Sequence, residues 1–350
     1  MNLNQKKSTD TSLIMPSLCK LNFCIQTHKE VIMDNLITQL LFSASITGPI
    51  CVMLLLGVLL KRIHLINDNF IEVASKLVFQ VTLPAMLFLS IVNAKHDFSS
   101  SSHLIIYGLI ANFAFFLFTI YSTRFAFKDK QNHGVIIQGG FRANTAIIAL
   151  AYVANAYGNT GVALAAIYVA STTILYNIQA VIALTPKNEN NKKQAVGIII
   201  KTLTKNPLII SIVLGIICSL LSIPVPGMLS QAGQYFANMT LPLALLCAGG
   251  SLNLHSMKEE SAATWFATSY KLILSPLFIT SGGILIGFRG LELGLIFFMS
   301  AAPTAAASYV MARAMGGNAI LAANIIAQTT VASLFTCTLG IFVLSSFNLI

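Results

Sequence analysis

Long apolar segments separated by short polar ones dominate the pattern of this chain. The apolar segments run for about twenty residues without alternating at a period of two, which is typical of membrane-spanning helices and not of barrel strands. The pattern predicts an all-α polytopic membrane protein. Its ten transmembrane helices are expected at 36–60, 69–92, 103–123, 134–157, 162–184, 206–222, 230–252, 263–287, 291–314 and 319–345.

Composition agrees with a membrane protein. Of the 350 residues, 56% are hydrophobic and 9% are charged, whereas a soluble globular chain has about 25% charged residues. The net charge of +10 comes mostly from basic residues between apolar segments, so we interpret it as a topology signal and expect no nucleic acid partner. The six cysteines stand singly without metal-ligand spacing, so neither a disulfide framework nor a metal site is predicted.

Basic residues predict the orientation of the spans. The connections after odd-numbered spans hold most of the loop lysines and arginines, and those after even-numbered spans hold only Lys95 and Arg289. By the positive-inside rule the odd connections are cytoplasmic and both termini lie outside the cytoplasm. The expected location is the inner (plasma) membrane.

The N-terminal segment 1–33 fits this topology poorly. It carries lysines that would have to cross the membrane, and it lacks the apolar region of a signal peptide. Two interpretations stay open for residues 1–32: a mis-assigned start, with Met33 as the natural beginning, or a disordered tail. Neither gives the segment any chemistry.

An internal repeat organises the rest of the chain. Thr82-Leu83-Pro84 recurs as Thr240-Leu241-Pro242 and Gly57 recurs as Gly215, both at an offset of 158 residues, and Asn144 aligns with Pro303 at an offset of 159. Five spans per repeat is an odd number, so the second repeat enters from the opposite side, as in the inverted repeats of secondary transporters. The predicted units are a first five-helix repeat at 34–184, a cytoplasmic linker with an interfacial helix at 185–205, and a second repeat at 206–350.

Two spans carry interruptions at matched depth. Span four reaches Arg142 to Thr145 about 12 to 16 Å from the cytoplasmic side, and span nine reaches Pro303 about 18 Å from the outside. Both positions are near the middle of an apolar core about 30 Å thick. In inverted repeats, broken helices at the midplane expose half-helix ends to a ligand. The alternative is that Pro303 only kinks its helix and that Asn144 pairs with a neighbour.

Charged residues inside the spans indicate the charge of an expected ligand. Arg142, Lys271 and Arg313 lie inside spans, and every Asp and Glu lies in a loop or near a span end. A charge in lipid costs at least about 2.5 to 3.5 kcal/mol, so each is a functional candidate. An anionic substrate is the expected counter-charge. The structural alternatives are that Arg313 extends to the cytoplasmic surface and that Lys271 binds backbone carbonyls.

Other residues are weaker candidates for the site. Pro84 and Pro242 could shape a cavity or only kink their helices. Asn177 and Gln328 are expected to bind neighbouring helices. The sequence has no catalytic constellation and no cofactor motif, so neither an enzyme nor a cofactor is predicted.

At the level of motifs the chain resembles the auxin efflux carrier family. The resemblance covers about 34–345 and is carried by TLPAMLF at 82–88, KNPLIISIVLGII at 205–217, TLPLALLCAGGSL at 240–252 and APTAAASYVMARAMGGNAILAANIIAQTT at 302–330. The family contains plant auxin exporters and bacterial permeases for malonate, malate and related carboxylates. The resemblance implies a ten-helix fold similar to bile-acid symporters, with a transport domain, a scaffold domain, and spans four and nine crossing at the ligand.

The family motif in span four supplies the candidate residues. It resembles Arg-Gly-Asn-Thr-Gly followed by Gly-Leu-Pro, and Arg142, Asn144 and Thr145 match it. Alanines stand at 143, 146, 149 and 151, where glycine or proline would be usual, so we expect span four to be less unwound than in relatives.

These observations predict secondary transport of a small organic anion, a mono- or dicarboxylate, by alternating access. Arg142 would attract the carboxylate, Asn144 and Thr145 would donate hydrogen bonds, and Pro303 with Thr304 would expose the second half-helix end. A sodium-coupled organic anion symporter and a non-transporting receptor or structural subunit remain alternatives. The expected partners are the anion and the lipid bilayer, and a homodimer is a candidate assembly.

Overall fold

A computed structural model gives the structure of residues 15–93, 102–128, 130–184, 206–252 and 262–350, with side chains described from Ile37 onward apart from that of Ala314. The predicted linker at 185–205 lies outside the described residues. The described part of the chain forms helices and short connections. It also contains an isolated antiparallel β-bridge between Ala143 and Thr304. The predicted all-helical class is therefore confirmed.

The elements follow one another as helices and π-helical turns, the latter labelled η. In chain order they are α1 (Met15–Arg62), α2 (Asp68–Leu77), η1 (Val78–Thr82), α3 (Leu83–Asn93), α4 (Ser102–Ala126), α5 (His133–Phe141), η2 (Thr145–Ala149), α6 (Leu150–Leu184), α8 (Pro207–Leu220), α9 (Gly227–Gly250), α10 (Ala262–Ser269), η4 (Tyr270–Leu274), α11 (Ser275–Ile286), α12 (Gly290–Ala301), α13 (Ala307–Ala314) and α14 (Ala319–Ser346).

Within the described residues, 6 stretches are long and apolar enough to cross a membrane, as judged by length and composition. They are Ile37–Arg62, Asp68–Asn93, Ser102–Ala126, Thr145–Leu184, Ala262–Ile286 and Ala319–Ser346. The apolar helices α8 and α12 are shorter, and span nine is divided between α12 and α13. The structure thus supports a polytopic membrane protein in which several predicted spans are short or interrupted.

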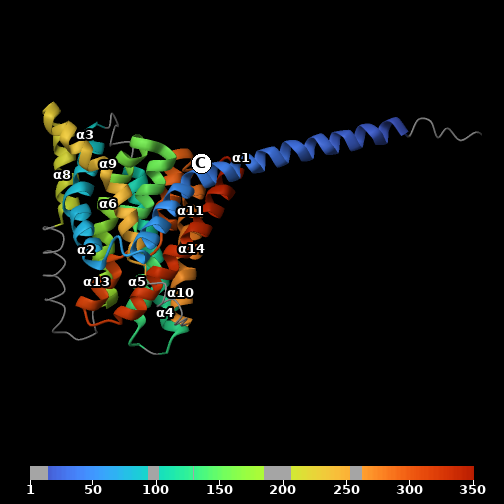
Figure 1. The fold of residues 1–350 in the computed structure, drawn as a ribbon. Coiled ribbons are helices and arrows are strands. Elements are labelled where there is room, and N and C mark those ends of the chain that lie inside the picture. The colour runs from blue at the N-terminus through green and yellow to red at the C-terminus, as the bar shows by residue number, and fades with distance from the viewer. Residues whose placement is uncertain (1–14, 94–101, 129, 185–205, 253–261) are drawn as a thin grey trace, which may run out of the picture.

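Helix α1 differs most from the sequence expectation. It contains 48 residues, so at 1.5 Å per residue it is about 72 Å long, more than twice the thickness of an apolar bilayer core. Its N-terminal part extends away from the bundle (Figure 1). Residues 15–32, for which a disordered tail was one expectation, are therefore helical and continuous with the first apolar segment.

Asparagine and glycine residues set several helix boundaries. Asn206 begins α8 by accepting a hydrogen bond from the Leu208 N–H, and Pro207 occupies the first helical position, where no N–H is needed. Asn318 caps α14 in the same way through the Leu321 N–H. Within α6, Gly158 has a φ of 58° and is not helical, so α6 is kinked between predicted spans four and five.

The helices pack as two groups. In the first group (α1, α2, α3, α8 and α9), α1 lies along α9 and α3 lies along α8, and these are the two most extensive helix contacts. The second group contains α4, α5, α6 and α10 to α14. The groups meet mainly where α1 contacts α14 and where α3 contacts α6.

The crossing of α1 and α9 is unusually close. A Cβ atom added to Gly57 would lie 2.2 Å from the Leu246 carbonyl oxygen, and one added to Gly249 would lie 2.1 Å from the Leu54 carbonyl oxygen. Only glycine permits backbones to approach this closely. The first group is therefore held together by direct backbone contact.

Candidate functional site

The interruptions of spans four and nine lie against each other. After α5 ends at Phe141, the Asn144 N–H donates to the Pro303 carbonyl at 2.7 Å. The Ala305 N–H, beyond the end of α12, donates to the Arg142 carbonyl at 3.1 Å. The two non-helical segments thus form a short antiparallel pair, here called the crossover (142–144 with 303–305).

Proline shapes the hydrogen bonding at the centre of the crossover. Directly opposed residues of an antiparallel pair can exchange two backbone hydrogen bonds. Asn144 and Pro303 form only one, because Pro303 has no N–H to return. The Asn144 carbonyl instead accepts from the Ala149 N–H at 3.1 Å, which begins the π-helical turn η2.

Thr304 is already bound within the protein. Its N–H donates to the Thr329 hydroxyl at 3.1 Å, and its own hydroxyl donates to the Gly139 carbonyl at 2.7 Å. The side chain is 1% exposed. The neighbouring Pro303 and Thr145 are also buried. Thr304 therefore positions the crossover against α5 and α14, and neither its N–H nor its hydroxyl is free for a ligand.

Arg142 carries a buried positive charge with neutral partners. Its side chain is 6% exposed. One terminal nitrogen donates to the Asn177 Oδ1 at 2.9 Å, and the other lies 2.6 Å from the Met311 sulfur. Among the described residues Arg142 has no ion pair, since the two that exist there join Lys61 to Asp68 and Lys76 to Glu72. Asn177, expected to bind a neighbouring helix, does so by orienting this guanidinium.

The other two intramembrane cations lie elsewhere. Lys271 is fully buried on η4, and its Nζ donates to the Ser300 carbonyl at 2.6 Å, as the backbone-carbonyl alternative predicts. Arg313 is exposed at the end of α13. Gln328, also expected to link helices, accepts a 3.3 Å hydrogen bond from the Thr268 hydroxyl. Arg142 is thus the one of the three cations that lies in the crossover.

Half-helix ends and a free carboxamide are accessible beside the crossover. Asn144 is half-buried, and its side chain has no hydrogen-bond partner among the described residues. Ala306 and Ala307 are exposed at the N-terminus of α13, and Ala146 is half-buried in η2. Helix N-termini carry partial positive charge and unpaired N–H groups. This arrangement can bind an anion.

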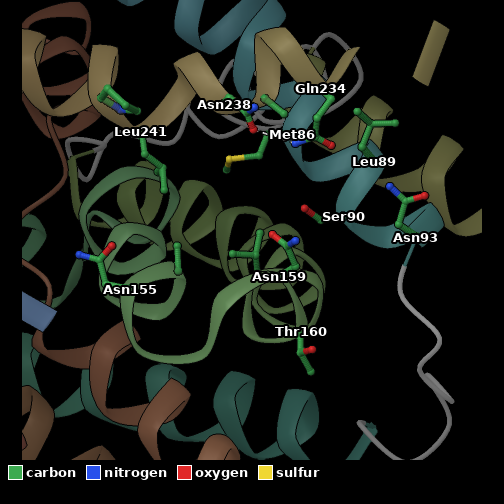
Figure 2. A pocket seen from close by; sticks show the side chains of 14 residues that line it. Met86, Leu89, Ser90, Asn93, Asn155, Asn159, Thr160, Gln234, Asn238 and Leu241 are labelled. Atoms are coloured by element: carbon green, nitrogen blue, oxygen red, sulfur yellow. Dashed lines mark hydrogen bonds between the residues drawn. The ribbon is translucent and has the colours of Figure 1, made fainter. Parts of the chain in front are cut away.

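A cavity of about 820 Å³ opens between α3, α6 and α9 (Figure 2). Among the described residues, its polar lining consists of hydroxyl and carboxamide side chains and contains no charged residue. These polar residues are Ser90, Asn93, Asn155, Asn159, Thr160, Gln234 and Asn238. Figure 2 shows Asn159 of α6 facing the same opening as Ser90 of α3 and Gln234 of α9. The cavity therefore lies where the two helix groups meet.

Few of the predicted residues line this cavity. Pro242 does, whereas Pro84 is buried in α3 and is absent from the lining. The crossover residues are absent from it too, although α9, which lines the cavity, also contacts η2 just after Asn144. Cavity and crossover are thus adjacent and separate in this conformation.

Sequence reasoning missed the carboxamides of the cavity. A usable signal exists in α9, since Gln234 and Asn238 are four residues apart, which places both on one face of their helix. Asn155 and Asn159 have the same spacing, but the non-helical Gly158 lies between them, so their spacing does not place them on one helix face. Within an apolar span a polar pair on one helix face predicts a hydrated or ligand-facing side.

Comparison with known proteins identifies relatives over most of the chain. Residues 46–341 match the profile of a family described as "Membrane transport protein". An "Uncharacterized transporter" of Methanothermobacter thermautotrophicus is 21% identical over 300 residues, which cover 84% of this chain and 96% of that protein. "Uncharacterized transporter YfdV" of Escherichia coli strain K12 is 24% identical over 302 residues, covering 84% and 93%. The matched range includes both the crossover and the cavity.

Proposed function

Because the chain belongs to the membrane transport protein family, which is the auxin efflux carrier family its motifs resemble, we propose that it is a secondary transporter of small organic anions. The proposed substrates are mono- or dicarboxylates, and the proposed mechanism is alternating access. Family membership supports membrane transport. The negative charge of the substrate and the mechanism are argued from the geometry.

The observation that carries the anion proposal is the buried Arg142. A guanidinium has five N–H donors and keeps its charge in proteins. Here it is 6% exposed and contacts a carboxamide oxygen and a thioether sulfur, neither of which neutralises it. Uncompensated charge away from water is costly. A substrate carboxylate that replaced the Met311 sulfur would gain charge-assisted, bidentate hydrogen bonds.

Asn144 and the half-helix ends supply the rest of the proposed site. The free Asn144 carboxamide can donate to the same carboxylate, and the N-termini of η2 and α13 point partial positive charge toward the crossover. These groups fix the orientation of the anion, whereas Arg142 supplies most of the attraction. Thr304 and Pro303 act on the backbone and not on the ligand.

An inverted repeat of ten spans is the proposed topology. Asn144 and Pro303, which the repeat aligns with each other, are also directly opposed in the crossover, as a two-fold relation between the halves requires. The contact of α1 with α9 (spans one and seven) corresponds under the same relation to that of α8 with α3 (spans six and two). With the basic loops inside, both termini face outward from the inner membrane.

The two helix groups supply the proposed moving parts. The first group acts as the scaffold and the second as the transport unit, because the cavity lies between α3 and α9 of one and α6 of the other. In the proposed topology Asn93 and Asn159 are near the outer ends of their helices, so the cavity faces outward. Movement of the second group would bring Arg142 and Asn144 to the substrate.

Ligand binding to Arg142 variants tests this proposal. We expect some mono- or dicarboxylates to raise the unfolding temperature of the purified protein, because a ligand that binds the native state stabilises it by mass action. Arg142→Ala should lower that affinity by roughly ten- to a hundred-fold, since charge-assisted hydrogen bonds contribute about 1.5 to 3 kcal/mol. Arg142→Lys should also weaken binding because an ammonium cannot form the bidentate fork.

The matched control is Arg289→Ala, which removes an exposed arginine whose partners among the described residues are the Ile284 and Phe288 carbonyls. Its anion affinity should equal that of the wild type. Wild-type affinity in the folded fraction of Arg142→Ala would refute the assignment of Arg142. If no carboxylate stabilised the protein or crossed the membrane of reconstituted vesicles, a receptor or structural subunit would be favoured.

A further inference from the structure

Two side-chain donors next to the crossover converge on one sulfur atom. The Arg142 Nη1 lies 2.6 Å from the Met311 sulfur, and the Gln138 Nε2 lies 3.9 Å from it. Gln138 and Arg142 are four residues apart at the end of α5, where the Arg142 N–H still donates to the Gln138 carbonyl, so their side chains are neighbours. A guanidinium and a carboxamide from this end of α5 therefore face the same atom of α13.

The sulfur is a poor partner for these donors. A thioether sulfur is a weak acceptor, whereas a carboxylate has two oxygens that accept charge-assisted hydrogen bonds. The other terminal nitrogen of Arg142 already donates to the Asn177 Oδ1 at 2.9 Å. The nitrogen that faces Met311 is thus the end of the guanidinium whose partner a ligand can replace. An anionic oxygen at the position of the sulfur would satisfy both donors better than the sulfur does.

Two buried polar groups near Met311 have no hydrogen-bond partner among the described residues. They are the Gln138 Oε1 and the Ser308 hydroxyl, and their residues are 0% and 2% exposed. Ser308 precedes Met311 by three residues, so both lie on one face of α13. Polar groups buried without a partner are costly and rare. Beside a candidate site they indicate groups that a bound ligand completes.

Met311 can leave its position without any change in the backbone. A methionine side chain has three rotatable bonds and adapts to irregular spaces. Met311 is half-buried, so part of its side chain already borders space outside the packed interior. Rotation of this one side chain would expose the Arg142 nitrogen and the Gln138 carboxamide together.

We propose that Met311 occupies the anion position while no anion is bound, and that Gln138 is a further anion-binding residue, uncovered when Met311 rotates away. The thioether holds Arg142 in place but competes with the substrate, so it lowers the affinity for the anion. In the bound state the Gln138 carboxamide and the Ser308 hydroxyl donate to the carboxylate beside Arg142. This inference rests on the proposed function, because it concerns the same anion.

The anion affinity of Met311→Ala tests the inference. Acetate, lactate, malonate and succinate serve as probes, titrated as sodium salts at constant ionic strength, and binding is measured from the rise in unfolding temperature. Met311→Ala should bind the carboxylate that stabilises the wild type roughly two- to ten-fold more tightly, because the competing contact is comparable to an ordinary hydrogen bond. The control Val310→Ala shortens an exposed side chain on the same helix and should keep wild-type affinity.

Gln138→Leu separates a binding role for Gln138 from a structural one. Leucine has a similar size but no donor, so the anion affinity should fall roughly two- to ten-fold. The unfolding temperature without anion should equal or exceed that of the wild type, because the substitution removes a buried oxygen that has no partner among the described residues. A purely structural glutamine would give the reverse: lower stability and unchanged affinity in the folded protein.

Nuclear magnetic resonance of isotope-labelled methionine methyl groups reports directly on Met311. The resonance that is missing from Met311→Leu belongs to Met311, and exchange of methionine for leucine is usually tolerated in a packed interior. Saturating the wild type with the stabilising carboxylate should shift this resonance. Sodium chloride at the same ionic strength should leave it in place.

The outcomes distinguish this inference from the proposed function. If the wild type binds a carboxylate but Met311→Ala binds it no more tightly, or the Met311 resonance does not move at saturation, the inference is overturned and the proposed function stands. Wild-type affinity in Gln138→Leu would remove Gln138 from the site. If neither the wild type nor Met311→Ala binds any probe, both proposals fail. If Met311→Ala does not fold, the resonance and Gln138→Leu decide.

Discussion

Adding one methyl group at the crossing of α1 and α9 should destabilise the protein measurably. In Gly249→Ala, the new Cβ would lie 2.1 Å from the Leu54 carbonyl oxygen and 2.8 Å from the Leu54 Cα. Ordinary contact begins at 3.4 Å. The obstructing atoms are backbone, so no side-chain rotation can relieve the overlap, and the two helices must separate by about 1 Å.

The expected size follows from two opposing effects. Overpacking a well-packed contact costs typically about 1 to 3 kcal/mol, and backbone obstruction places this site at the upper end. Replacing glycine by alanine inside a helix contributes about 1 kcal/mol in the other direction. We therefore expect a net loss of about 2 kcal/mol in the free energy of unfolding.

Gly48→Ala on α1 is the matched control, because beyond the neighbouring helix backbone no atom of the described residues lies within 4 Å of its added Cβ. Gly48→Ala keeps the gain in helix propensity from alanine and avoids the steric overlap, so it should leave the protein equally or more stable. Thermal or denaturant unfolding in detergent can be followed through the fluorescence of Trp265 on α10, which is remote in sequence from both helices.

Equal stability of Gly249→Ala and Gly48→Ala would refute the close crossing. A double variant provides a second check, since Gly57→Ala acts on the same contact from α1, 2.2 Å from the Leu246 carbonyl oxygen. Once one methyl group has separated the helices, the second should cost less. The double variant should lose at least about 0.5 kcal/mol less than the sum of the single losses.

Two other predictions concern the second helix group and the cavity. Asn112→Ala should lower the free energy of unfolding by about 1 to 3 kcal/mol, because the buried Tyr168 and Tyr176 hydroxyls lose their shared partner; an unchanged unfolding temperature would contradict this. In a variant without native cysteines, Ser90→Cys or Asn159→Cys should react in intact cells with a membrane-impermeant maleimide, whereas the buried Ser300→Cys should not. Reaction from the cytoplasmic side alone would reverse the proposed orientation.

The interruptions were predictable from local sequence, but their geometry was not. Pro303 cannot continue a helix, so a break in span nine followed from one residue. Span four has alanines where glycines are usual, and we expected it to be less unwound. It is nevertheless non-helical at 142–144, because the Pro303 carbonyl gives the Asn144 N–H a partner outside its own helix. That partner is 159 residues away, and no local propensity encodes it.

For the side chains too, burial was predictable from the sequence, whereas their contacts were not. Burial of Arg142 could be expected from its depth in span four, whereas its contacts with Asn177 and Met311 depend on how α6 and α13 pack. Thr304, expected to help expose a half-helix end to the ligand, is bound to Gly139 and Thr329. The π-helical turns at 78–82, 145–149 and 270–274 were not predicted, because their altered hydrogen bonding has no residue code.

In the proposed inverted repeat, the single hydrogen bond between Asn144 and Pro303 has a consequence for how far the two halves can differ. A symmetric dimer of two identical five-helix chains would carry the same residue at both positions of this pair. It would therefore form two such bonds, or none if both residues were proline. When both halves belong to one chain, one can carry asparagine and the other proline at this pair. The pair then forms one hydrogen bond, and the Asn144 carbonyl is free to accept from the Ala149 N–H at the start of η2. A single chain thus lets the two halves of the proposed repeat carry different residues at this pair, which two identical chains could not do.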